Sequence, residues 1–135
     1  MKTVFFYGLF MDKDLLKGKG INPHNIKRAF LKGYQLKIGE RATLVPDKEA
    51  CSYGIVMELD INELHNLYGS DGVEDYVPQT VQVYTIVGEP IEAVSYILPM
   101  EKISGSNSEY AIKLAKLAKK LELPDYYIDE IEGWI

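Results

Sequence analysis

Three carboxylates between residues 64 and 76 are the leading candidates for chemistry in this chain. The stretch reads LHNLYGSDGVEDY, in which Asp71, Glu74 and Asp75 directly follow a short helical pattern. A carboxylate can act as a general acid or base at neutral pH when desolvation or a neighbouring negative charge raises its pKa. The same residues also suit a solvated acidic turn, so this stretch taken alone leaves both interpretations open.

A second candidate is the segment FFYGLFM, which closes an apolar N-terminal run. Gly8 stands directly after that run. A glycine just past a strand lets the chain turn sharply and leaves the following backbone N–H groups free to hold a carboxylate or an oxyanion. Gly8 is equally compatible with the simple end of a strand.

Tyrosines are a third feature, since the chain contains ten of them. Tyr7, Tyr76, Tyr96 and Tyr110 fall near the ends of predicted strands or helices. Their hydroxyl groups could line a polar pocket, and the alternative is that they pack in the core with a satisfied hydroxyl group.

Other catalytic chemistries find little support in the sequence. His65 has no serine or cysteine partner in a recognisable nucleophile motif, and Cys51 has no basic neighbour that would activate its thiol. The glycine-rich segments KGKG and GSDG lack the Gly-Lys-Ser/Thr ending of a phosphate-binding loop. One cysteine and two distant histidines give no paired spacing for a metal.

Length and charge narrow the class of protein. We expect a single domain over residues 1–135, with 47% hydrophobic residues and a net charge of -5. This charge argues against a nucleic-acid or anionic-membrane partner, both of which favour a basic face. We find no signal-peptide pattern and no run of about 18 apolar residues that could span a membrane. The sequence therefore predicts a cytoplasmic protein that needs no cofactor; its oligomeric state is left open.

The hydrophobic pattern predicts an α+β fold with an antiparallel or mixed sheet, because strand patterns dominate the first hundred residues and helices the tail. Pro46 is expected to stop one strand, and the segment VGEP is expected to form the turn of a hairpin. The predicted strands cover 2–8, 32–39, 42–46 and 52–60, with two more within 76–98.

Capping residues mark the expected helices. Asp12 is a candidate N-cap with Gly18 as the residue just past the helix end. Asp60, followed three residues later by Glu63, fits a capping box, and Ser106 is expected to open the strongest amphipathic helix. The predicted helices cover 11–18, 60–68, 106–123 and 124–135.

The order of these segments resembles the γ-glutamylcyclotransferase-like family, which includes γ-glutamylamine cyclotransferases and AIG2-like proteins. FFYGLFM resembles its Tyr-Gly-Ser/Thr-Asn/Leu loop, and LKGYQLKIGERATLVPD and SYGIVMELDINELHNL resemble its second and third blocks. GSDGVEDYVPQTVQV falls where the family carries Leu-Asp-x-x-Glu-Gly, a spacer, Tyr and a valine-rich strand, and VSYIL matches the next strand. SEYAIKLAKLAKKLELPDYYIDEI resembles the C-terminal helix and Leu-Pro. The resemblance thus covers nearly the whole chain.

The resemblance implies a small mixed β-barrel with flanking helices. It also implies an acyl-transfer lyase that releases 5-oxoproline and an amine or amino acid from a γ-glutamyl compound, without a cofactor. After Tyr7, the backbone amides of Gly8, Leu9 and Phe10 would hold the glutamyl end. The glutamate of Leu-Asp-x-x-Glu-Gly would be the general acid/base.

The chain departs from the family pattern at this motif. Aligned on it, Tyr68 replaces the first aspartate and Asp71 replaces the catalytic glutamate; Glu74 could serve instead if the loop is shifted. The first hypothesis is therefore an enzyme that uses Asp71 or Glu74. The alternative is a family member that binds a small ligand without turnover. In both cases the pocket is expected to be lined by Tyr7, Gly8, Leu9, Phe10, Tyr76, Tyr96 and Tyr110.

Overall fold

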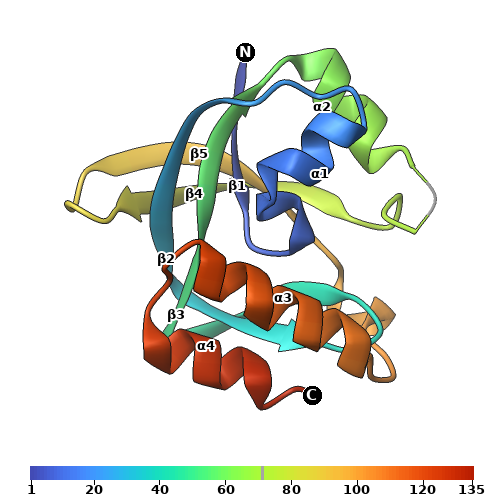
Figure 1. Cartoon of the computed structure of the whole chain (residues 1–135), viewed down its shortest axis with the longest axis vertical. Helices are drawn as coiled ribbons and strands as arrows, with labels where there is room; N and C mark the ends of the chain where they lie inside the picture. Colours follow the sequence, from blue (N-terminus) through green and yellow to red (C-terminus); the bar gives the residue numbers. More distant parts are fainter. Residues whose placement is uncertain (71) are drawn as a thin grey trace.

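The computed structural model describes residues 1–70 and 72–135 (Figure 1). In chain order its strands are β1 (Lys2–Phe6), β2 (His24–Ile38), β3 (Ala42–Leu59), β4 (Val77–Thr85) and β5 (Pro90–Ile97). The α-helices are α1 (Lys13–Gly18), α2 (Ile61–Tyr68), α3 (Ser108–Lys120) and α4 (Asp125–Glu132), and the short 3-10 turns are η1 (Leu9–Met11) and η2 (Met100–Lys102). Within the described residues, no helix is long and apolar enough to cross a membrane.

The strands form a closed barrel in the order β1-β3-β2-β4-β5. β1 runs parallel to β5 and antiparallel to β3, and the remaining neighbours are antiparallel. The expected mixed β-barrel with flanking helices is confirmed. Closure removes the exposed strand edges that an open sheet would present.

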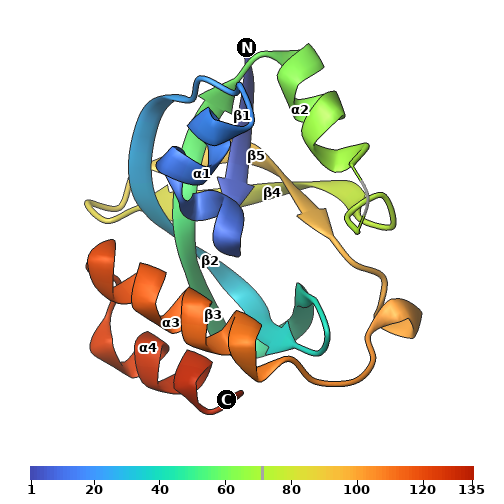
Figure 2. The same cartoon turned by 45° about the vertical axis from the view of Figure 1, so that its right-hand side comes forward.

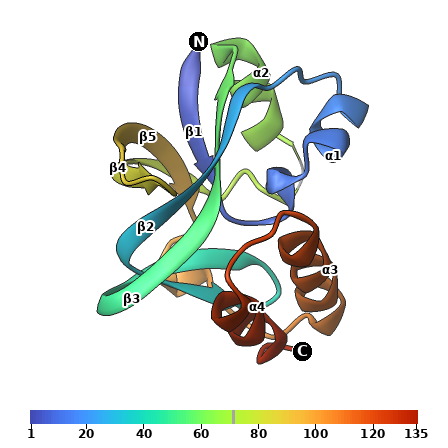
Figure 3. The same ribbon diagram turned by 60° about the vertical axis from the view of Figure 1, so that its left-hand side comes forward.

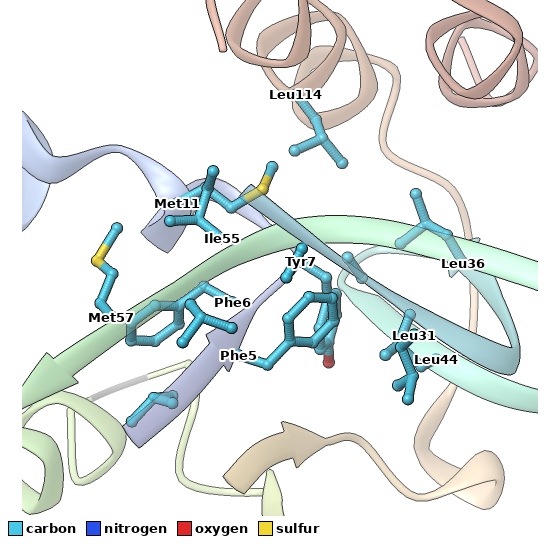
Figure 4. Packing of buried hydrophobic residues seen from close by; sticks show 14 of the residues in the cluster. Phe5, Phe6, Tyr7, Met11, Leu31, Leu36, Leu44, Ile55, Met57 and Leu114 are labelled. Carbon is cyan, nitrogen blue, oxygen red and sulfur yellow. The ribbon is translucent and has the colours of Figure 1, made fainter. Parts of the chain in front are cut away.

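The apolar run at the N-terminus is explained by the position of β1. Val4, Phe5 and Phe6 are all buried, because one face of β1 points into the barrel and the other is covered. Figure 4 shows Leu114 of α3 directed toward Met11 of η1, so the helices extend the core beyond the barrel wall. Figure 3 shows α1, α3 and α4 gathered on one side of the barrel.

The long ribbon of β2 and β3 corrects the strand predictions. β3 continues through Pro46, which pairs with Tyr34, and absorbs both strands expected in this region. β1 pairs with residues 55–59 of β3, so Pro46 lies outside the part of β3 that is paired with β1, in a position where a strand tolerates proline. The first half of β2, from His24, was not predicted because its polar residues show no alternation.

The helix predictions are closer to the structure. The capping box of Asp60 and Glu63 forms as expected. Gly18, however, is the last residue of α1 rather than the residue past its end, and Gly20 takes the left-handed backbone conformation there (φ 81°). Asn107, not Ser106, caps α3, because its side chain accepts the N–H of Tyr110 at 3.0 Å.

Candidate active site

A cavity of about 290 Å³ opens beside the end of β1. Figures 1 and 2 show η1 and α1 between α2 and α3, and the cavity adjoins these elements. Its volume is at the lower end of the range for small-molecule pockets, roughly 300 Å³ upward, so it suits a small metabolite. The described lining residues are Phe6, Tyr7, Gly8, Leu9, Phe10, Leu15, Lys19, Arg41, Ala42, Tyr68, Gly72, Val73, Tyr76 and Tyr110.

The loop after β1 is fastened to α3 through Tyr110. The Leu9 N–H donates to the Tyr110 hydroxyl group at 3.3 Å. A Cβ atom on Gly8 would lie 2.5 Å from the same hydroxyl oxygen, so only glycine fits without a shift. Of the three amides expected to hold a substrate, that of Leu9 is thus already paired with a protein group, and all three residues line the cavity.

Tyrosines form much of the polar wall. The Tyr7 hydroxyl donates to the Tyr96 carbonyl at 2.7 Å, and the Tyr76 hydroxyl donates to the Ala42 carbonyl. The ring of Tyr68 stacks on that of Tyr96 with centroids 3.8 Å apart. Tyr96 was expected to line the pocket but is not among the described lining residues; it contacts Tyr7 and Tyr68, which do line it.

Burial sets the protonation of these hydroxyl groups. It raises the pKa of Tyr7 and Tyr68 well above the ordinary value, and neighbouring tyrosines raise both further. Burial also raises the pKa of Tyr76, and it raises the pKa of Tyr110 to about 12 against the Leu9 hydrogen bond, which lowers it. All four hydroxyl groups are neutral near pH 7, as tyrosine hydroxyl groups ordinarily are, and burial keeps them neutral to a higher pH.

Arg41 connects two turns that border the cavity. Its guanidinium donates to the Gly72 carbonyl and to the Asp75 carboxylate, each at 3.3 Å, and lies over the Tyr76 ring. Asp75 also pairs with Lys102 at 3.7 Å. These contacts hold the turn before β4 against the turn between β2 and β3.

The carboxylates expected to be catalytic are placed as follows. Glu74 is exposed and is not among the described residues that line the cavity. Asp71 lies outside the described residues. Asp75 serves the ion pairs with Arg41 and Lys102. Within residues 1–70 and 72–135, no acidic side chain lines the cavity and no three metal-ligating side chains gather.

Sequence reasoning missed the two cations of the cavity wall. Arg41 lies in a tight turn between two strand patterns, a place that signals a loop but not a direction for the side chain. Lys19 is the C-cap residue of α1 in the segment KGKG, where a lysine gives no signal of a binding site. Tyr68 was not among the residues expected to line the pocket, although its spacing of four residues from Leu64 on the predicted helix indicates an inward position.

Comparisons with known proteins agree with this architecture. A solved structure of a gamma-glutamyl cyclotransferase superposes with a TM-score of 0.80 at 20% identity, covering 99% of this chain and 88% of that one. An uncharacterised human protein superposes with a TM-score of 0.77 at 21% identity over 99% and 88% of the two chains. A yeast gamma glutamyl cyclotransferase specific to glutathione gives 0.68 at 13% identity over 98% and 94%. At these identities the likeness establishes the shared fold.

Sequence comparison gives the family. No curated protein matches the chain. Residues 52–131, more than half of the chain, match the model of the AIG2-like family. This segment includes α2, the turn before β4 and the first residues of α3, which together supply Tyr68, Tyr76 and Tyr110 to the cavity. The chain belongs to the AIG2-like family.

Proposed function

We propose that this protein is a γ-glutamylcyclotransferase-like enzyme, which converts a γ-glutamyl compound into 5-oxoproline and a free amine or amino acid. Membership of the AIG2-like family and the fold shared with gamma-glutamyl cyclotransferases support the reaction class. The observation that carries the proposal is the meeting of the Gly8–Phe10 loop with the turn at Gly72–Tyr76 in one small cavity.

The reaction needs only proton transfer and positioning. The α-amine nitrogen of the substrate attacks its own γ-carbonyl carbon, the bond from that carbon to the leaving nitrogen breaks, and the proton lost by the α-amine ends on the leaving amine. No water or cofactor is consumed. Because attack is intramolecular, holding the substrate in a folded conformation supplies a large part of the acceleration.

The cavity offers suitable groups for this task. The backbone N–H of Phe10 and the neutral hydroxyl groups of Tyr68 and Tyr110 can donate to the glutamyl carboxylate or to the oxygen of the tetrahedral intermediate. Apolar walls at Phe6, Phe10 and Val73 limit the access of water to the cavity. Asp71 is our first candidate for the acid/base, and Glu74 is the second.

A ligand-binding protein without turnover is the alternative function. It is favoured by the absence of an acidic side chain among the described lining residues and by Tyr68 in place of the family aspartate. Asp71 is also one methylene group shorter than the glutamate it replaces. A misplacement of about 1 Å can cost roughly a hundredfold in rate.

The test is an assay of 5-oxoproline release from a panel of γ-glutamyl amides. Wild type is compared with Asp71→Asn, with Glu74→Gln and with Glu92→Gln, a control on the exposed part of β5. Loss of the acid/base should lower kcat by about a hundredfold or more. If wild type binds these amides but releases no 5-oxoproline, the binding function is correct; if it is active and neither variant is slowed, both assigned carboxylates are wrong.

A further inference from the structure

The two positively charged residues that line the cavity differ in whether a carboxylate pairs with them. Lys19 and Arg41 are the charged side chains among its described lining residues. Arg41 is matched by Asp75, 3.3 Å away. Lys19 forms no ion pair with any part of the chain that the structure describes. Lys19 is therefore the lining cation whose charge no described carboxylate offsets.

The groups around Lys19 leave its ammonium group available to a ligand in the cavity. Lys19 is the C-cap residue of α1, a position where the helix dipole favours a cation. Lys19 and Glu63 also line a second cavity, of about 270 Å³. The Glu63 carboxylate accepts the N–H groups of Asn22 at 3.1 Å and of Asp60 at 3.3 Å. Both oxygens of Glu63 thus accept backbone N–H groups, and among the described residues Glu63 and Lys19 form no ion pair, although Lys19 lines both cavities.

The wall next to Lys19 is apolar. Leu15 of α1 lies four residues before Lys19, the C-cap residue of that helix, and both residues line the cavity. Phe10 and Tyr68 continue this wall, with their rings edge to face at 5.7 Å. A ligand in this part of the cavity meets an apolar surface that ends in a positive charge.

Resting on the proposed function, we propose that Lys19 is a specificity-determining residue, which selects γ-glutamyl compounds whose leaving group carries a carboxylate beside an apolar side chain. The glutamyl end is assigned to the Gly8–Phe10 loop, so an anion at Lys19 belongs to the leaving group. The ammonium group attracts that anion and repels a leaving group that carries a free amine, which gives discrimination by repulsion as well as attraction. The bonds formed and broken in the reaction are unchanged.

A matched pair of substrates isolates this effect. γ-Glutamyl-leucine and γ-glutamyl-isoamylamine differ only in the carboxylate of the leaving group. We expect wild type to prefer the leucine compound in kcat/KM by about five- to tenfold, since a solvent-accessible ion pair contributes modestly. Lys19→Gln should bring the ratio close to one, chiefly by raising KM for the leucine compound, and Lys19→Glu should reverse it.

Lys17→Gln is the matched control, because Lys17 lies on the same helix but is not a described lining residue. It should keep the wild-type ratio. An equal ratio in wild type and Lys19→Gln overturns the role of Lys19 while leaving the reaction intact. If neither compound yields 5-oxoproline, the proposed function fails separately. In that case calorimetry measures the affinity of wild type and of Lys19→Gln for both compounds. If wild type binds the leucine compound more tightly and Lys19→Gln does not, the role of Lys19 is supported. If the two proteins show the same preference between the compounds, the role of Lys19 is overturned.

Discussion

The guanidinium group of Arg41 lies 3.3 Å from the carboxylate of Asp75, a residue 34 positions further along the chain. The same guanidinium reaches the Gly72 carbonyl, and its central carbon lies 6.0 Å from the centre of the Tyr76 ring. One side chain thus joins two turns that both border the cavity. Its position makes it a positioning residue for the turn before β4.

Removal of this link should reduce activity more than stability. We expect Arg41→Gln to lower kcat/KM by about tenfold, since small shifts of site residues are costly. The free energy of unfolding should change by no more than about 1 kcal/mol, because the two side chains are 32% and 41% exposed and such pairs are weak. A double-mutant cycle with Asp75→Asn, read in kcat/KM and in urea unfolding, measures the coupling.

Two further variants test whether the effect is specific. Arg41→Lys keeps the positive charge but loses the planar guanidinium group that can donate to two acceptors at once. Its kcat/KM should therefore lie between those of Arg41→Gln and wild type. Arg28→Gln breaks an exposed pair with Glu122 whose residues do not line the cavity, and it should leave kcat/KM unchanged. An additive cycle between Arg41 and Asp75 would contradict the positioning role.

The contact between Gly8 and Tyr110 predicts that a methyl group added at Gly8 destabilises the fold when the Tyr110 hydroxyl group is present. Gly8 has a negative φ of -113°, so alanine is compatible with its backbone, and the obstacle is the Tyr110 hydroxyl group at 2.5 Å. We expect Gly8→Ala to destabilise the fold by about 1–3 kcal/mol, as overpacking does. Its effect is read from thermal and urea unfolding.

The double variant Gly8→Ala/Tyr110→Phe provides the control. Without the hydroxyl oxygen, the methyl group has room, so the double variant should regain part of the stability lost in Gly8→Ala. Additive losses in the two single variants would show that the clash is not the cause.

The buried tyrosines predict a loss of stability at alkaline pH. Burial raises the pKa of Tyr110 to about 12 from the ordinary value of 10.0, whereas in the unfolded chain the group ionises near 10.0. Between these values the unfolded state has lost more protons, so the free energy of unfolding falls as pH rises through this window and is unaffected below it. Tyr7, Tyr68 and Tyr76 are raised in the same direction.

Urea unfolding between about pH 8 and about pH 11 measures this dependence. Tyr110→Phe removes one of the groups, so its stability should decline less steeply above pH 10 than that of wild type. Equal slopes for the two proteins would contradict the raised pKa of Tyr110. Stability that instead declines from pH 8 would point to other groups.

Local signals in the sequence predicted the starts of two helices, because an N-cap side chain bonds to backbone groups within a few residues of itself. Asp12 accepts the N–H groups of Asp14 and Leu15, and Asp60 forms its capping box, as their spacing indicates. The extent of the strands was less predictable, because strand pairing depends on distant partners. The polar start of β2 becomes a strand only through its pairing with β3, where Lys27 lies opposite Val56.

The sequence by itself determined the N-caps at Asp12 and Asp60, the hairpin of β4 and β5, the mixed barrel expected from the family resemblance, and six of the fourteen described residues that line the cavity. The tertiary structure decided how these residues meet. Leu9 reaches the Tyr110 hydroxyl group across 101 positions of sequence, Lys19 and Arg41 enter the cavity wall, and Glu74 remains exposed. The physical reason is that a residue's type and spacing specify its local backbone, whereas the direction of a side chain in a turn depends on the packing of the elements around it.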